Sequence, residues 1–486
     1  MKAASVRLMP KQGSVLLTCI NMALIGRVTM QQGIRVLATR TLSILQWGTF
    51  MKNSVLALSF GLAAFGIGIA TAADPAKIDW SRIKATTVPL FYPGQSSYEW
   101  VRSDAHKGAD TKVSRGAACA SCHDDKDAEK DLGNEIVKGG RLEPTPVAGK
   151  NGFVSLSVQA AYDARNAYLR FQWKTNNPYP GTEHQYLRFD GKDWKVWGFP
   201  KLDKVVQEGK QPGIYEDRMS IMIDDGKVAG FAQQGCWLSC HDGMRDMPKQ
   251  FTKEEVAANA LLTAIKKSDV RKYLPDSRTD PSDWKTGKTV EELAKLKAEG
   301  KFVDLIQWRA HRSHAVGMAD DGYVLEWRLG DAGKEMFSGN ADANTHAPKF
   351  MWDEKKMGYR SITADSQARK GNLFLIRETN AVPFDPNLAW KEGDMVPDYV
   401  MSREDANGSA ADNNAIASWK DGTWTVVMIR PLGLANADDK SLKAGGVYNV
   451  GFAVHDDNIT TRGHHVSFVK TLGLGAKADI RAIKLP

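Results

Sequence analysis

Cysteine is scarce in this chain of 486 residues: there are five, and four of them gather in two short clusters. After residue 72 the sequence has no run of 18 apolar residues, so no membrane span is predicted in that part. Long repeats and low-complexity segments are also absent. The part after residue 72, about 414 residues, is enough for one large domain or two smaller ones.

An excess of positive charge is missing from the same part. Residues 1–72 hold seven basic residues and no acidic ones, and without them the net charge falls from +8 to +1. The basic character of the whole chain therefore belongs to its first segment. It gives no support for nucleic-acid binding.

That first segment contains the features of an export signal. Met51-Lys52-Asn53 precedes an apolar run over 54–69, and Ala70-Thr71-Ala72 is a small-x-small cleavage motif. Residues 51–72 are therefore predicted to be a signal peptide, which implies a periplasmic protein without a membrane span. We interpret residues 1–50 as an upstream extension before the true start at Met51. A long or unusual leader is the alternative.

The two cysteine clusters carry the chemistry. Cys119-Ala-Ser-Cys122-His123 is a CxxCH motif, the attachment signature of c-type haem, and Cys236-Trp-Leu-Ser-Cys240-His241 is the rarer CxxxCH form. Two thiols add to the porphyrin vinyl groups and the histidine binds the iron. We therefore predict two covalently bound haem c groups. They would be attached at Cys119, Cys122, Cys236 and Cys240, with His123 and His241 as axial ligands.

Two other uses of these cysteines remain. Pairs of disulfides are one, and a zinc site built from both cysteine pairs is the other. The 113-residue gap between the pairs and the adjoining histidines argue against both. Cys19 is the fifth cysteine and lies in the leader.

Each iron needs a second ligand or an open position, and His and Met are the usual candidates. His106 lies 13 residues before Cys119 and is the candidate for the first haem. His464 and His465 open a predicted strand, where neighbours point to opposite faces, so at most one reaches a given haem. Met244 and Met247 are further candidates for the second haem.

The remaining histidines give weaker signals. His311 and His314 form either a ligand pair or a basic loop at a sheet edge, and the loop is the preferred interpretation. His184, His346 and His455 have no context that indicates a metal site.

The alternation of apolar and polar residues along the sequence predicts a mainly β fold. Many short segments with period-two alternation are separated by Asp-Gly turns, which is typical of an antiparallel sandwich or barrel. Helical patterns do not alternate with strands, which excludes a parallel α/β order. The predicted strands lie at 153–158, 167–173, 220–223, 323–327, 372–376, 423–429, 448–454 and 465–469, and the turns at 190–191, 225–226, 321–322 and 421–422.

Two capping boxes interrupt this pattern. Thr252-Lys-Glu-Glu255 and Thr289-Val-Glu-Glu292 each predict a helix start, and Gly300 ends the second helix. We therefore predict a helical insertion over 252–300 used for packing or for a partner. The predicted organisation is a c-type haem module over 73–140 and a β-sandwich haem domain over 141–486.

From about residue 140 onward the chain resembles the haem-binding domain of the ethylbenzene-dehydrogenase gamma-subunit family, which includes the cytochrome b subunits of dimethylsulfide, selenate and chlorate reductases. The matching segments are 143–144, 149–150, 160–163, 168–173, 221–225, 430–432, 448–454 and 466–467. The resemblance implies a β-sandwich that holds one b-type haem with Met and Lys as ligands.

This chain departs from that pattern in two ways. The CxxxCH motif would make the haem covalent, with His241 as a ligand. The lysine position of the family falls at His464 or His465, and we favour His464, which predicts a bis-histidine second haem. Residues 104–123 resemble a c-type module added before the sandwich, as in periplasmic multihaem relatives.

Together these features predict a periplasmic dihaem c-type cytochrome that transfers electrons between a respiratory donor and a redox enzyme, with no catalytic residues of its own. Its partner would be a molybdenum-enzyme subunit, a membrane quinol-oxidising cytochrome or a soluble cytochrome. The alternative is a haem enzyme, such as a small-molecule reductase or peroxidase, with one open iron and an acid–base group among His311, His314 and Asp320–Asp321. A haem-based sensor is a third class, disfavoured because no signalling domain is visible.

Overall fold

The structure is a computed structural model that describes residues 72–247, 249–366 and 373–486. The described residues belong to one compact unit. The predicted extension over 1–50, Cys19 and all of the predicted signal peptide except Ala72 lie outside the described residues. Within them, no helix is long and apolar enough to cross a membrane.

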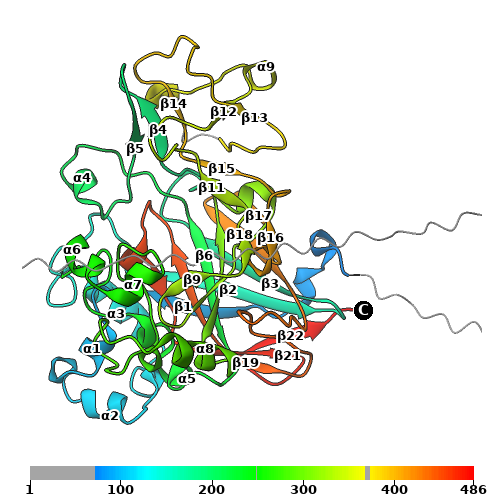
Figure 1. The fold of residues 1–486 in the computed structure, drawn as a ribbon. Helices are drawn as coiled ribbons and strands as arrows, with labels where there is room; N and C mark the ends of the chain where they lie inside the picture. The colour runs from blue at the N-terminus through cyan, green and yellow to red at the C-terminus, as the bar shows by residue number, and fades with distance from the viewer. Residues whose placement is uncertain (1–71, 248, 367–372) are drawn as a thin grey trace, which may run out of the picture. The chain divides into compact units, whose positions relative to one another are not determined.

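The described chain is mainly β, as the alternation of its sequence predicts. Its largest element is a 13-stranded sheet whose pairings are antiparallel except where β22 joins β2 and β21 (Figure 1). The strands are β1 (Thr86–Phe91), β2 (Phe153–Tyr162), β3 (Asn166–Lys174), β6 (Arg218–Asp224), β7 (Val303–Arg309), β8 (Gly322–Val324), β9 (Arg328–Gly330), β17 (Asn414–Lys420), β18 (Thr423–Pro431), β19 (Val447–His455), β20 (His465–Val466), β21 (Lys470–Leu474) and β22 (Ile480–Lys484).

Strands from both halves of the large sheet contribute side chains to one hydrophobic core. The strand order is β17-β18-β3-β2-β1-β20-β19-β6-β7-β8-β9. Alternate residues of each strand enter this core: Leu156 and Val158 from β2, Phe171 from β3, and Val450 and Phe452 from β19. Because β21 and β22 link β19 back to β2, the pairings also close into a ring. This is the antiparallel sandwich or barrel that the sequence predicts.

The individual strand predictions were mostly confirmed. The Asp421-Gly422 turn joins β17 to β18 as a two-residue hairpin, and both residues have positive φ, as a type I′ turn requires. The strand predicted at 372–376 was wrong, because in its described residues only Ile376 makes an isolated bridge. The turn predicted at 321–322 was also wrong, because Gly322 already pairs with Gly330 in β8. One strand was missed: β1 lies between β2 and β20, inside the segment predicted as the N-terminal module.

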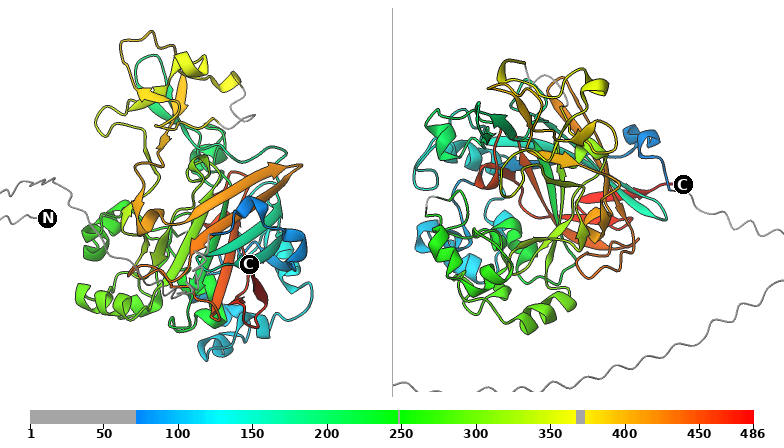
Figure 2. Two further views of the ribbon diagram at one scale, coloured as in Figure 1. Left: turned by 90° about the vertical axis from the view of Figure 1, so that its right-hand side faces the viewer. Right: turned by 45° about the horizontal axis from the view of Figure 1, so that its top comes forward.

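A second group of small sheets is built from residues 186–197 and 333–408. Its parts over 186–197, 350–366 and 373–397 lie apart from the centre of the large sheet (Figure 1 and Figure 2), whereas its strand at 407–408 lies beside β17 and β18 (Figure 1). Its strands are β4 (Tyr186–Phe189), β5 (Trp194–Trp197), β10 (Gly333–Lys334), β11 (Phe337–Gly339), β12 (Phe350–Trp352), β13 (Ala381–Pro383), β14 (Met395–Pro397), β15 (Tyr399–Met401) and β16 (Asn407–Gly408).

The helices are short, and two of them begin where the capping boxes predict. The side chains of Thr252 and Glu255, and of Thr289 and Glu292, cap α6 and α8 reciprocally. The α-helices are α1 (Tyr98–Val101), α2 (Asp110–Ser114), α3 (Ala128–Ile136), α4 (Lys204–Gln207), α5 (Phe231–Gln234), α6 (Lys253–Ala257), α7 (Ala260–Ala264), α8 (Val290–Ala298) and α9 (Glu354–Met357).

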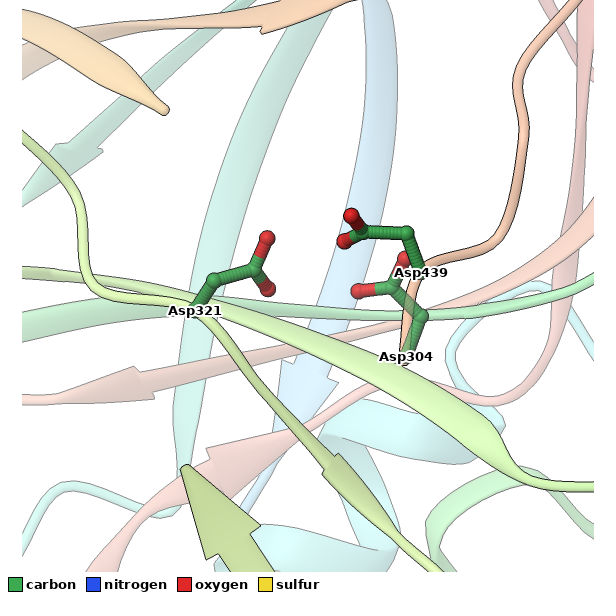
Figure 3. Close-up of side chains that lie close together, drawn as sticks. All are labelled: Asp304, Asp321 and Asp439. Atoms are coloured by element: carbon green, nitrogen blue, oxygen red, sulfur yellow. The ribbon is translucent and has the colours of Figure 1, made fainter. Parts of the chain in front are cut away.

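A buried arginine ties β18 to the rest of the sheet. Three carboxylates, from Asp304, Asp321 and Asp439, turn toward one another (Figure 3). The guanidinium of Arg430 lies among them, at 2.6 Å from Asp304, 2.8 Å from Asp321 and 2.9 Å from Asp439. Arg430 is 1% exposed and bonds all three carboxylates, while burial raises the pKa of Asp304 to about 6 and also raises that of Asp321.

Candidate cofactor sites

The first cysteine cluster lies beside a mostly apolar pocket, whose lining comes mainly from residues near β1, α1–α3 and the second cluster. We call this the first pocket; about 800 Å³ of empty space, part of it open to solvent, lies among Cys119, Cys122, His123 and His106. Its other lining residues are mostly apolar, with Phe91, Trp100, Val101, Val113, Leu132, Ile136, Leu142, Trp237 and Phe468 among them.

Local structure sets the spacing of the cluster. Residues Cys119–Ser121 form a 3-10 turn, and the N–H groups of Cys122 and His123 both donate to the Cys119 carbonyl, at 3.2 and 3.1 Å. This turn folds the CxxCH segment back on itself, so that both cysteines and the histidine line one pocket.

His106 and His123 face each other across the first pocket. Their ring centres are 6.3 Å apart and their planes differ by 10°. An imidazole nitrogen binds a metal at about 2.0–2.1 Å and lies about 1.2 Å from its ring centre, so two imidazoles on opposite sides of one ion have centres about 6.4 Å apart. The observed spacing fits one iron between the two rings.

The hydrogen bonds of the pair leave the correct nitrogens available. His106 Nδ1 lies 3.0 Å from the Val101 carbonyl, which fixes Nδ1 as the protonated nitrogen and leaves Nε2 free. Burial, and then the neighbouring His106, lower the pKa of His123, which keeps this ring neutral and able to bind a metal. Trp100 packs against the His106 ring at 4.8 Å between centres and restricts its orientation.

The four cysteines of the two clusters are free thiols. Burial raises the pKa of Cys119 to about 11 and that of Cys236 to about 12, and it also raises the pKa of Cys240. The expected disulfide alternative therefore has no counterpart among the described residues. Neutral, unpaired thiols are the form that thioether attachment needs.

The second cluster opens onto a different pocket, between β6, β19 and the helical insertion. This second pocket contains about 890 Å³ of empty space, and Cys236, Cys240, His455 and His464 lie on its wall. Met244 and Met247, the methionines singled out from the sequence, line it too. The pocket therefore brings the second cysteine pair together with two kinds of candidate ligand, histidine and methionine.

His241 itself is turned away from this pocket. Its Nδ1 lies 2.7 Å from a carboxylate oxygen of Glu99, its Nε2 lies 3.1 Å from the Tyr273 carbonyl, and its ring stacks on Tyr273 at 3.6 Å. A carboxylate on Nδ1 is the usual partner of a histidine that binds metal through Nε2. For His241 to do so, its ring must exchange the Tyr273 carbonyl for the iron.

The two adjacent histidines of the C-terminal segment differ in the way that strand geometry predicts. His464 lines the second pocket, and its Nδ1 bonds the Thr461 carbonyl, which leaves Nε2 for a ligand. His465 is 0% exposed and has partners at both nitrogens, the Asn151 carbonyl at 2.7 Å and Lys150 at 3.4 Å. His464 is therefore the better placed of the two candidates.

His455 is a candidate that the sequence analysis did not select. It also lines the second pocket, and its ring stacks on that of His464 at 4.8 Å. Its Nδ1 is buried and has no partner among the described residues. The only sequence signal was its position at the end of a strongly alternating strand, which does not distinguish it from a core residue.

The basic side chains on the wall of the second pocket can be compared with the two negatively charged propionates that a haem would bring. Arg218 is 6% exposed, and its Nε and Nη2 atoms have no hydrogen-bond partner among the described residues. Arg328 donates to a neutral acceptor, Gln307 Oε1, at 2.5 Å. Neither guanidinium has a carboxylate of its own at hydrogen-bond distance, and a haem carries two propionates. The residues present therefore fit this group.

The two pockets are neighbours, and Trp237 joins them. It follows Cys236 in the second cluster but lines the first pocket, where its indole lies 5.5 Å from Phe91 and 5.7 Å from Phe468 between ring centres. Its Nε1 donates to Ser96 Oγ at 2.9 Å. Cys119 and Cys236 pack against the same hydrophobic cluster. The second cluster thus contributes to both sites.

The other histidines lie elsewhere. His311 lies in the turn that follows β7, but it is 1% exposed and bonds the Thr182 carbonyl at 2.8 Å, so this loop is buried rather than exposed as predicted. His314 packs against Trp308 and Trp424. His184 lies in a polar chamber next to the second pocket, and His346 is exposed in a turn. None of them lines either pocket.

The functional residues that sequence reasoning missed are mostly polar partners from distant segments. Glu99 precedes the first cluster by 20 residues yet supports His241, and Arg218 begins a strand with no motif around it. Lys272 and Arg271 show that the helical insertion does more than pack, because both lie on the pocket wall.

Comparison with known proteins places this geometry in context. The family model described as ethylbenzene dehydrogenase matches residues 77–467, a range that contains both clusters and His464. Cytochrome c-552 of Stutzerimonas stutzeri is 28% identical over 438 residues, which are 89% of this chain and 100% of that protein. Cytochrome c-551 of Rhodocyclus tenuis is 29% identical over 223 residues, 46% of this chain and 72% of that protein.

Proposed function

This chain belongs to the ethylbenzene dehydrogenase family, and from that premise we propose that it is a periplasmic dihaem c-type cytochrome that carries electrons between a respiratory donor and a redox enzyme. Relatives named as cytochromes c support the electron-transfer role and covalent haem. The single observation that carries the proposal is the His106–His123 pair, whose rings stand 6.3 Å apart over the first cysteine cluster.

In the first pocket, Cys119 and Cys122 would attach the macrocycle, and His123 and His106 would hold its iron. The Val101 carbonyl holds His106 in the tautomer that offers Nε2. Phe91, Trp100 and Phe468 line the pocket with apolar surface. With both histidines bound, the iron would have no open position for a substrate.

In the second pocket, Cys236 and Cys240 would attach the macrocycle and His464 would bind its iron. His241, oriented by Glu99, is the proposed second ligand, and Met244 on the pocket wall is its competitor. Arg218 and Arg328 would bind the propionates. When bound, haem c supplies a one-electron Fe(III)/Fe(II) couple.

The partner is proposed from the chemistry of the site alone. Two sites joined by Trp237 suit a relay that receives an electron at one surface and delivers it at another. A molybdenum-enzyme subunit, a membrane quinol-oxidising cytochrome and a soluble cytochrome all fit such a relay. The predicted signal peptide over 51–72 is the basis for the periplasmic location.

Haem counting tests the proposal. The exported protein should carry two haems by the pyridine haemochrome assay and by intact mass, and the reduced form should not bind carbon monoxide. A mass gain of one haem would remove the second attachment site from the proposal. A high-spin haem that binds carbon monoxide would instead favour the enzyme alternative.

A further inference from the structure

A large polar chamber adjoins the second pocket. We call it the cationic chamber: it holds about 1500 Å³ of empty space, open to solvent, between the large sheet, the helical insertion and the small sheets. Seven basic side chains and three carboxylates line it among the described residues. Arg218, Arg245, Arg271 and Arg328 line both this chamber and the second pocket.

Some of these charges are already balanced. Arg309 makes two hydrogen bonds to Asp320, at 2.7 and 2.9 Å. Arg312 binds Glu216 at 2.7 Å, and the other oxygen of Glu216 accepts two backbone N–H groups at 2.9 Å each. Asp269 lies 2.7 Å from Arg271 and 3.6 Å from Arg245. Each of these carboxylates is therefore already paired with at least one arginine.

Three cations remain without a carboxylate at hydrogen-bond distance. The Nε atom of Arg218 lies 3.5 Å from Glu216 without a hydrogen bond. Arg328 bonds only the amide oxygen of Gln307, and Lys267 lies over the Trp327 ring at 4.5 Å. Buried N–H groups without an acceptor are costly, so the Nε and Nη2 groups of Arg218 can take a further anionic acceptor.

The pKa of a buried phenol, that of Tyr215, reflects the same excess of positive charge. Burial by itself would raise the pKa of Tyr215, but Arg218 and Arg312 lower it to about 7. Burial and the neighbouring arginines likewise lower the pKa of Arg328 to about 9. The field inside the chamber is therefore strongly positive.

The two propionates of a haem in the second pocket account for only part of this charge. They would reach the chamber at the shared residues Arg218 and Arg328, whereas Lys267 and Tyr215 line the chamber and not the pocket. A guanidinium has five N–H donors, so each shared arginine can serve a propionate on one side and a second anion on the other.

We propose that the cationic chamber binds a small inorganic oxyanion beside the propionate edge of the second haem, held by Lys267, Tyr215 and the shared arginines. This site rests on the proposed function for the second pocket. The oxyanion would be a ligand in addition to the haems. Its negative charge next to the haem edge would favour the ferric state and so lower the reduction potential of that haem.

Sulfate binding to the ferric holoprotein, measured by calorimetry at constant ionic strength and fixed pH, tests this. We expect saturable binding at one site. Lys267→Gln should weaken it by about tenfold, because one charge-assisted hydrogen bond is lost, and Tyr215→Phe should weaken it less. Lys285→Gln is the matched control, because Lys285 also lies over a tryptophan ring, at 5.6 Å, but is exposed outside the chamber. Its affinity should equal that of the unmodified chain.

The outcomes separate the two proposals. Absence of saturable binding, or equal affinity in Lys267→Gln and Lys285→Gln, would mean that the propionates alone satisfy the arginines and would overturn the site. Haem content, measured on the same samples, reports the proposed function independently. Normal far-ultraviolet dichroism and haem spectra in each variant establish that a lost affinity is not a folding defect.

Discussion

The two pockets each adjoin a cysteine pair, but they are lined by different kinds of residue from different parts of the chain. The first takes its cysteines and both histidines from residues 106–123, and its walls are apolar. The second takes its cysteines from one segment and His464 from another more than 200 residues away, and arginines rim it. The candidate ligands of the first site come from one short segment, although Phe91, Trp237 and Phe468 from other segments complete its wall, whereas the second site is assembled from distant strands and includes buried charge.

The strongest way to break this comparison is to remove the attachment sites in pairs. Cys119→Ala/Cys122→Ala and Cys236→Ala/Cys240→Ala should each lower the covalent haem content by one, measured by intact mass. The first pair should leave the other haem spectrum unchanged. A loss of both haems from either double variant would contradict the independence of the two pockets.

The axial ligands give the next largest effect. His106→Ala should leave the first haem five-coordinate, so that the reduced protein binds one carbon monoxide per chain, because no other histidine among the described residues lines that pocket. His346→Ala is the control, since His346 is exposed in a turn. An unchanged low-spin spectrum in His106→Ala would refute the pairing with His123.

In the second pocket the corresponding test compares neighbours. His464→Ala should disturb the spectrum of one haem, whereas His465→Ala should not, because His465 bonds Asn151 and Lys150 instead. Low-temperature magnetic circular dichroism of the ferric protein distinguishes histidine from methionine ligation. A methionine signature would move the other axial position from His241 to Met244 or Met247.

A smaller effect should follow from Glu99→Gln. Its carboxylate lies 2.7 Å from His241 Nδ1 and raises the basicity of that imidazole, which favours the ferric state. The variant should raise the midpoint potential of the second haem alone, by about 59 mV for each tenfold change in the ratio of ferric to ferrous affinity. Equal shifts of both potentials in a redox titration would show that Glu99 acts through the protein as a whole.

The smallest effect lies outside both pockets. Burial, with a smaller effect of His311, lowers the pKa of His314 to about 4 from its usual 6.5. The unfolded chain therefore takes up a proton that the folded chain does not, so stability is complete above about pH 6.5 and falls as the pH approaches about 4. His314→Gln should reduce this acid destabilisation by on the order of 2 kcal/mol, measured by denaturant unfolding, without changing either haem spectrum. His346→Gln should leave the pH profile as it is.

Prediction from sequence succeeded where the signal is local. The alternation in β2, β3, β18 and β19, the Asp421-Gly422 hairpin and both capping boxes depend on residues a few positions apart, and all were confirmed. It failed at 372–376, where an apolar run does not form a strand in its described residues, and it missed β1. The apolar run at 372–376 is compatible with irregular packing as well as with a strand. Which of the two forms depends on whether a neighbouring strand is available to pair with it.

The sequence by itself determined that two thiol pairs each adjoin a histidine and that the fold is mainly antiparallel β. Only the tertiary structure decided that the His106 and His123 rings lie 6.3 Å apart, that His464 rather than His465 lines the second pocket, and that two N–H groups of Arg218 have no hydrogen-bond partner. The physical reason is that motifs and strand periodicity arise within a few residues, whereas ligand pairing and charge balance arise between segments that meet only when the sheet closes.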